Sequence, residues 1–201
     1  MNVFIGNKLL LGLLLVLVSC LLIVGCSEND KTKTVEAKKS TQSVAKDEAV
    51  IQAFIEKHFN GPDKKYRELW NAAMEIQTAE MSEEDYNAWM NGPEYTALTD
   101  YTSDTYALYF TENTYDAFSK TEAFAYSFSD QAYKITPSAI EIKQNEIEKT
   151  LYNFTFHVIY ENETGEKETF EYEGEAIVPI EGKIGKIQFN DQEGLLQKIA
   201  E

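Results

Sequence analysis

The strictest constraint on the fold is the alternating segment LYNFTFHVIY at residues 151–160. Successive side chains of a β-strand point to opposite faces of the sheet, so a strand with one buried face alternates apolar and polar residues. One face of this segment would carry Tyr152, Phe154, Phe156, Val158 and Tyr160. The other would carry Leu151, Asn153, Thr155, His157 and Ile159. We therefore expect a strand with its aromatic face in a core.

A second alternating segment, ETFEYEGEAIV at residues 168–178, predicts the partner of this strand. Its inward residues would be Phe170, Tyr172, Ala176 and Val178, and its outward residues Glu171, Glu173 and Glu175. The outward glutamates would repeat every ~6.6 Å along the strand, which is too far for neighbours to share one cation. We expect them to be solvated.

The loop between the two segments fixes their register. Opposed residues must lie on the same face, and the inward residues of both segments have even numbers, so the numbers of two opposed residues must sum to an even number. A two-residue loop would pair residues whose numbers sum to an odd number. A three-residue loop at 163–165 meets the condition, with Gly165 in the left-handed conformation that such loops require. This loop sets Val158 against Phe170 and Phe156 against Tyr172.

The first half of the domain follows the helical period instead. Apolar residues recur at helical spacing in DEAVIQAFIEKHF, with Asp47 as the expected cap and Asn60-Gly61 as the stop. A second helix is expected after Asp63, ending near Gln77. Helical structure therefore precedes the predicted strands.

Two further helices are expected before the strands. Ser82, followed three residues later by Asp85, forms a capping-box pattern that opens a third helix, which stops at Asn91-Gly92-Pro93. The pattern from Tyr95 to Phe118 stays helical but broken, with a short helix beginning at Thr111.

Beyond Lys120 the period becomes alternating. We expect strand structure at residues 124–128 and again at 140–142, separated by Pro137. The segment GKIGKIQF at 182–189 predicts the last strand, and DQEGLLQKIAE a closing helix.

This order predicts one α+β domain at residues 47–201, in which N-terminal helices pack on a curved antiparallel sheet meander. Helices followed by such a meander resemble the nuclear transport factor 2-like superfamily, whose cone-shaped domains occur in many exported proteins of Gram-positive bacteria. A cystatin-like sheet is the main alternative. The superfamily includes isomerases, dehydratases and non-catalytic modules, so the resemblance does not fix the function.

The charge of the chain excludes one class of partner. A formal net charge of −16, from 18 basic and 34 acidic residues, would repel nucleic-acid phosphates, and we therefore expect no nucleic-acid partner. Between Glu68 and Ser119 there are 11 carboxylates, several tyrosines and no Lys, Arg or His. This tract indicates either helices with acidic outer and aromatic inner faces, or a surface that attracts cations or sugars.

The amino-terminal residues 9–26 carry no charge, and as a helix they would span ~27 Å. Lysines flank this run on both sides, so the positive-inside rule does not orient it. An uncleaved anchor helix is one interpretation.

The sequence Ile23-Val24-Gly25-Cys26 at the end of this run resembles the lipobox of bacterial lipoproteins. The resemblance implies that Cys26 receives a diacylglyceryl group and that a peptidase cuts between Gly25 and Cys26. Residues 1–25 would be a cleaved signal peptide, and residues 26–46, without aromatic residues, a lipidated flexible linker. The expected location is the cell membrane, lipid-anchored and facing outside the cytoplasm.

Candidate chemistry in the domain is sparse. His58 would end the first helix, where a cation complements the helix dipole. His157 would face Glu171 across the strand pair, which favours its charged form and makes the pair a candidate for acid–base chemistry. No residue from Ser27 to Glu201 is a cysteine, and the motifs of serine hydrolases, zinc proteases, phosphate-binding loops and EF-hands are absent. We assign no catalytic, cofactor-binding or metal-ligating residue.

Two functions fit these observations. The first is a non-catalytic module that binds an envelope protein, glycan or small ligand near the membrane. The second is a small cone-fold enzyme, of isomerase, dehydratase or hydrolase type, that uses buried carboxylate, tyrosine or histidine groups. A deep pocket holding such groups favours the enzyme, whereas a filled core with an exposed apolar or aromatic groove favours the binding module.

Overall fold

The computed structural model of the chain describes residues 29–77, 80–129, 131–191 and 194–200. The chain divides into two compact units, Met1–Gln42 and Ser43–Glu201. The predicted signal peptide and lipobox, with Gly25 and Cys26, lie outside the described residues. The following account concerns the second unit unless stated.

The first described helix, α2, spans Asn29–His58. Residues 29–46, which were predicted to belong to a linker, are therefore helical, and they contain no glycine or proline to interrupt the helix. Asp47 lies inside α2, so the prediction that it caps a helix is wrong. The predicted end is confirmed, because α2 stops just before Asn60-Gly61. Its core-facing residues are fully buried: Ile51, Phe54 and Ile55.

Four helices follow, namely α3 (Lys64–Ile76), α4 (Glu83–Met90), α5 (Pro93–Tyr106) and α6 (Glu112–Thr121). The predicted starts after Asp63 and at Ser82 and Thr111 are confirmed, as are the predicted stops near Gln77 and at Asn91-Gly92-Pro93, whereas α6 continues beyond Phe118 to Thr121. Ser82 caps α4, since its Oγ accepts a hydrogen bond from the Asp85 N–H at 3.1 Å. Gly92-Pro93 separates α4 from α5, and Pro93 is the first residue of α5, where the missing N–H costs no helical bond.

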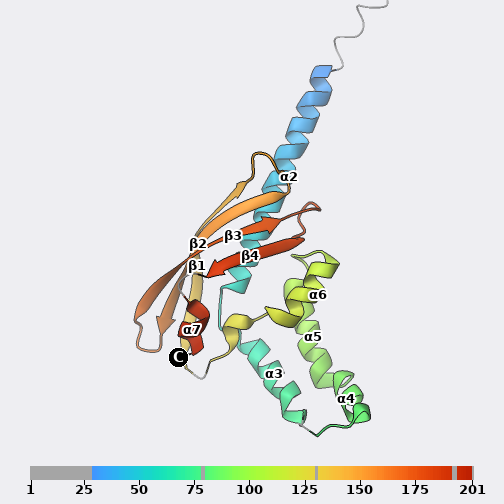
Figure 1. Cartoon of the computed structure of the whole chain (residues 1–201), viewed down its shortest axis with the longest axis vertical. Coiled ribbons are helices and arrows are strands. Elements are labelled where there is room, and N and C mark those ends of the chain that lie inside the picture. Colours follow the sequence, from blue (N-terminus) through green and yellow to red (C-terminus); the bar gives the residue numbers. More distant parts are fainter. Residues whose placement is uncertain (1–28, 78–79, 130, 192–193, 201) are drawn as a thin grey trace, which may run out of the picture. The chain divides into compact units, whose positions relative to one another are not determined.

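The second half forms a four-stranded antiparallel sheet in the order β1-β2-β3-β4 (Figure 1). The strands are β1 (Tyr133–Gln144), β2 (Leu151–Asn162), β3 (Lys167–Ile177) and β4 (Lys186–Asp191). A short helix, α7 (Leu195–Ala200), follows the last strand, as predicted. Helices first and a meander second confirm the α+β class.

The predicted register of the central hairpin is confirmed. Val158 pairs with Phe170 and Phe156 with Tyr172, and Gly165 has a φ of 85°. Residues at the even positions 152–160 of β2 are buried, while the intervening residues are exposed or half-buried. The alternation in the sequence therefore reports the two faces of the sheet correctly.

The segment before the sheet departs from the prediction. Residues 124–128 form no strand: Ala125–Ser127 is a 3-10 turn, and Phe124 adopts a left-handed φ of 58°. The Phe124 ring stacks on Tyr66 of α3 at a centroid distance of 3.9 Å. The apolar alternation here reflects contacts with helices and not a pleated strand.

Pro137 does not separate two strands, because β1 runs through it and Pro137 pairs with Val158. A proline has no N–H to donate, and β1 is an edge strand, where one side of the backbone needs no partner. The register shifts between Ser138 and Glu141, and Ala139 has a φ of 50°. A bulge thus follows the proline.

The core lies between α2 and the inner face of the sheet. Phe59 contacts Phe156 and Tyr172 of the sheet, with ring centroids at 4.8 and 4.9 Å. Gly174 of β3 leaves room on this inner face for the ring of Phe154, since an added Cβ would collide with that ring and with the Gln188 carbonyl oxygen. The small residue lets the sheet close over its own aromatic side chains.

Candidate binding site

The space between α2 and the sheet, where a cone-shaped enzyme would hold its substrate, is filled by side chains. Phe54, Phe59, Tyr152 and Val158 are fully buried there, and Phe156 is 1% exposed. Aromatic rings at 4.8–6.2 Å from one another occupy this layer. Interiors packed in this way leave few voids larger than a water molecule.

His58 lies within this aromatic layer and not at a solvated helix end. Its side chain is 6% exposed, and its Nδ1 makes no hydrogen bond within the described part of the chain. Six aromatic rings surround it: Phe54, Phe59, Tyr106, Phe118, Tyr126 and Phe189. Burial lowers the pKa of His58 from 6.5 to about 3.

The predicted position of His58 at the end of α2 is therefore correct, but its predicted role is wrong. A histidine with a pKa of about 3 is neutral at pH 7, so it brings no positive charge to the helix dipole. The helical period alone placed the residue, whereas its charge depends on the rings that other elements pack around it.

Asp47 is a buried carboxylate beside a tyrosine. It is 7% exposed; its Oδ2 accepts a hydrogen bond from the Tyr152 hydroxyl at 3.0 Å, and its Oδ1 accepts one from the Gly182 N–H at 2.8 Å. The Tyr152 oxygen in turn accepts one from Gln144 at 3.2 Å. Burial and the bond to Asp47 raise the pKa of Tyr152. These bonds join α2 to the sheet and to the turn before β4.

Asp63 forms a second network at the start of α3. Its carboxylate accepts hydrogen bonds from the Tyr66 N–H at 3.0 Å, from the Tyr101 hydroxyl at 3.0 Å and from Lys57 at 3.2 Å. Its own N–H donates to Ser127 Oγ at 3.0 Å. Burial would raise the pKa of Asp63, but the three donors outweigh it and lower the pKa below its usual value.

Both carboxylates therefore act as structural links. The oxygens of each accept hydrogen bonds from elements distant in sequence, so a reacting group would have to displace these bonds. The sequence predicted that a helix begins after Asp63, but nothing in it pointed to Tyr101 as a partner of Asp63. The pairing of Asp47 with Tyr152 likewise had no sequence signal.

The predicted pairing of His157 with Glu171 is confirmed, since the two residues oppose each other in the β2–β3 register. The His157 Nε2 lies 3.7 Å from the Glu171 Oε1, and the side chains are 45% and 76% exposed. The pair thus sits on the outer face of the sheet, where an ion pair contributes little. It faces solvent and not the filled interior.

The same outer face carries a hollow of about 780 Å³ near the β1 bulge, which we call the polar hollow because most of the residues that line it are polar. Its lining includes Glu141, Lys143, Asn153, Glu173, Glu175 and Gln188. Within the described ranges, no group of three or more His, Cys, Asp or Glu side chains is arranged to hold a metal ion. The hollow offers hydrogen-bonding groups and charges of both signs, and Ile142 and Phe154 add apolar surface to its lining.

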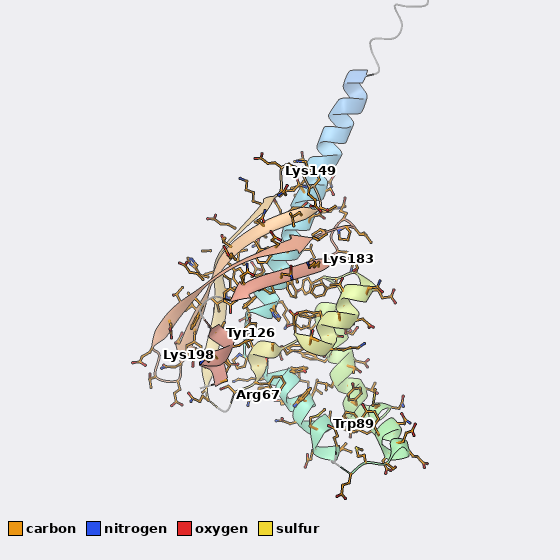
Figure 2. All side chains as sticks on the ribbon, in the orientation of Figure 1. Arg67, Trp89, Tyr126, Lys149, Lys183 and Lys198 are labelled. Atoms are coloured by element: carbon orange, nitrogen blue, oxygen red, sulfur yellow. The ribbon has the colours of Figure 1, made fainter. Side chains whose placement is uncertain are left out.

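A second concavity lies among the helices and differs in character. A cleft of about 460 Å³ opens between the end of α3, α4 and the start of α5. Its apolar lining is Ile76, Met81, Ala88, Trp89 and Pro93, and its acidic lining is Glu80, Asp85 and Glu94. We call it the acid-rimmed cleft. Figure 2 shows Trp89 at the end of the helical part that is distant from the sheet.

Three local features build the acid-rimmed cleft. The Trp89 Nε1–H donates to the Ala73 carbonyl at 2.8 Å, which ties α4 to α3. The Trp89 ring packs on Tyr95 of α5 at 4.6 Å. Gly92 allows the tight turn between α4 and α5, because an added Cβ would lie 3.1 Å from the Trp89 carbonyl oxygen. The cleft therefore has a fixed floor.

The acidic tract from Glu68 to Ser119 forms helices with carboxylates outside and most aromatic residues inside, as one of the two interpretations predicted. All of its carboxylates are exposed except Glu94, which is half-buried, and among its tyrosines Tyr106 is buried and Tyr86 exposed. The sequence indicated helices with acidic outer faces and aromatic inner faces as one interpretation of this tract. It did not indicate that Ile76, 46% exposed, would lie in one cleft with Trp89 and Pro93.

Comparison of the chain with protein-family models, with curated proteins and with solved structures finds no match. Across residues 29–77, 80–129, 131–191 and 194–200, no helix combines the length and the apolar character needed to cross a bilayer. The apolar run at residues 9–26 is not part of these ranges.

Proposed function

We propose that this protein is a lipid-anchored lipoprotein on the outer side of a bacterial membrane, and that its acidic domain is a non-catalytic binding module. The observation that carries the second part is the filled interior together with the acid-rimmed cleft. The anchor is supported by the lipobox at residues 23–26, with two acyl chains on Cys26 giving stable attachment.

For the finer fold we propose a cone-type arrangement of the nuclear transport factor 2-like or cystatin-like kind. One helix, α2, packs along the inner face of an antiparallel meander, which supports this proposal. In this arrangement the end of α3, α4 and the start of α5 form an addition to the cone, and the acid-rimmed cleft belongs to the addition. The binding function would then reside outside the cone.

The enzyme alternative receives less support. It needs a pocket that holds a carboxylate beside a tyrosine or histidine. Asp47 with Tyr152, and Asp63 with Tyr101, meet the chemical requirement, but each carboxylate is engaged in bonds that hold elements together. His58 is enclosed by rings, and neither Asp47 nor His58 lines the cleft or the polar hollow.

Metabolic labelling with a clickable fatty acid tests the anchor. We expect the wild-type protein and the Cys20→Ala variant to carry label, and the Cys26→Ala variant to carry none. Cys20 is the matched control because it lies in the same apolar run and is the other cysteine of the chain. Label on Cys26→Ala, or a mature protein that begins at another residue in mass spectrometry, would refute the assignment.

Photo-crosslinking in intact cells tests the binding module. A photoreactive residue is placed at Ile76 in the cleft or, as a control, at Ile147, which is 94% exposed in the β1–β2 turn. We expect a discrete adduct from position 76 and none from position 147. The proposal that the cleft binds is wrong if position 76 gives no adduct or if both positions give the same adducts.

A further inference from the structure

We infer that the acid-rimmed cleft binds a cationic peptide segment of a partner protein, with one apolar side chain of that segment as the anchor. This inference rests on the proposed binding function and names the class of its partner. It combines two independent observations, an exposed apolar floor and a rim of one charge.

The apolar floor indicates that the occupant contributes an apolar side chain. Ile76 is 46% exposed, and Met81, Ala88 and Pro93 line the same cleft. Exposed apolar surface that is rimmed by polar groups is typical of interaction sites. A cleft of about 460 Å³ falls within the range of ligand-binding clefts, but it is too small for a whole domain. A side chain on a short segment fits it.

The rim indicates that the occupant is positively charged. Glu80, Asp85 and Glu94 line the cleft, and the chain between residues 68 and 119 contains no Lys, Arg or His to neutralise them. The Asp85 carboxylate accepts a hydrogen bond from the Ser82 hydroxyl at 2.6 Å. This bond fixes the position of the carboxylate but does not neutralise its charge. Three carboxylates around an apolar floor attract lysine or arginine flanking an apolar residue.

The same charges disfavour two other occupants. A second copy of the chain would bring another acidic helical surface against this one, because residues 47–201 hold 12 basic and 31 acidic residues. An anionic lipid surface would be repelled for the same reason. A cationic segment is the occupant that the charge pattern accepts.

The test uses the full-length protein in neutral detergent micelles and fluorescence anisotropy of labelled nine-residue peptides. The probe peptide has a central leucine flanked on each side by alternating lysine and serine. One control peptide replaces the leucine by serine, and another replaces the lysines by glutamate. Spaced single charges with one leucine keep these peptides from inserting into the micelles.

We expect the probe to bind and the glutamate peptide not to bind. Removing the central leucine should weaken binding about fivefold, and raising the salt from 50 to 500 mM should weaken it about tenfold, since exposed charges are screened at high salt. The double variant Glu80→Gln/Glu94→Gln should weaken binding about tenfold. Ile76→Ser should remove the preference for leucine.

The matched control is Glu146→Gln/Glu148→Gln in the β1–β2 turn, which changes the net charge equally at exposed residues outside the cleft. We expect a change of less than twofold. Equal weakening by the two double variants would show that only net charge attracts the peptide and would overturn the inference. Binding of the glutamate peptide, or a leucine preference that persists in Ile76→Ser, would overturn it as well.

The outcome is distinguishable from failure of the proposed function. A crosslink from Ile76 to a cellular partner, with no binding of the cationic probe, would keep the binding module and refute the cationic class. An adduct of twice the chain mass would identify a second copy as the occupant and also refute the inference.

Discussion

His58 offers a direct measurement of how strongly the core excludes charge. Its pKa is about 3 in the folded protein and about 6.5 in an unfolded chain. Between these pH values the unfolded state binds about one more proton at this residue than the folded state does. The free energy of unfolding must therefore fall as the pH falls from 6.5 towards 3.

The expected loss is large. The free energy of unfolding falls by about 1.4 kcal/mol for each pH unit in this window. Protonation of His58 alone should therefore lower it by on the order of 3 kcal/mol between pH 7 and pH 4.5. The full contribution, about 5 kcal/mol, is lost only at pH 3 and below. Replacing His58 by phenylalanine keeps a ring in the aromatic layer and abolishes the titration.

At pH 7 the His58→Phe variant should differ from the wild type by no more than about 2 kcal/mol. Removing an unpaired buried nitrogen stabilises the fold by about 1–3 kcal/mol, and the fit of a different ring costs a similar amount. The change in stability with pH is therefore the informative quantity, and the stability at one pH is not.

Guanidinium chloride unfolding, followed by the fluorescence of Trp70 and Trp89, measures this change at pH 7 and pH 4.5. The two proteins contain the same acidic residues, so the difference between them isolates His58. His157→Gln is the control, because it removes the other histidine of the chain, which lies on the outer face of the sheet and not in the aromatic layer. The reasoning is refuted if wild type and His58→Phe lose the same stability between the two pH values.

Three further predictions concern the same unfolding assay at pH 7. Asp63→Ala should lower the free energy of unfolding by about 2–3 kcal/mol, because it removes a helix cap and a charged hydrogen bond. Tyr101→Phe should lower it by about half as much, and equal losses for the two variants would contradict the proposed network. Gly165→Ala should cost about 1 kcal/mol through its φ of 85° alone, since nothing lies within 4 Å of the added Cβ, and Gly165→Asn should cost less. Gly174→Ala should cost about 3 kcal/mol because its Cβ would collide with the Phe154 ring, and a cost no greater than that of Gly165→Ala would show that the sheet can open there.

The filled interior also bears on how such a domain can function. The acid-rimmed cleft lies among α3, α4 and α5, and α4 is at the end of the helical part that is distant from the sheet (Figure 1). The residues that line the cleft take no part in the packing of α2 on the sheet. We therefore expect cleft variants such as Glu80→Gln to leave the unfolding free energy within about 0.5 kcal/mol of the wild type.

The sequence by itself determined the elements whose signals are local. The register of β2 and β3 followed from the alternation of apolar residues and the length of one loop, and Gly165 took the conformation that the loop required. Ser82, Asp63 and Pro93 marked helix boundaries because their side chains act on backbone groups within three residues.

The tertiary structure alone decided the state of residues whose partners are distant in sequence. Asp47 lies inside a helix and bonds to Tyr152 and Gly182, more than a hundred residues away. The alternating residues 124–128 pack on helices, and the spacing of apolar residues in the sequence could not indicate this. Pro137 is tolerated because β1 is an edge strand. The sequence predicted the position of His58 correctly but its charge wrongly, because the pKa of an imidazole depends on the rings and the solvent around it. Periodicity and caps act over a few residues, whereas burial and pairing are properties of the assembled core, and for this reason the candidate cleft emerged only in three dimensions.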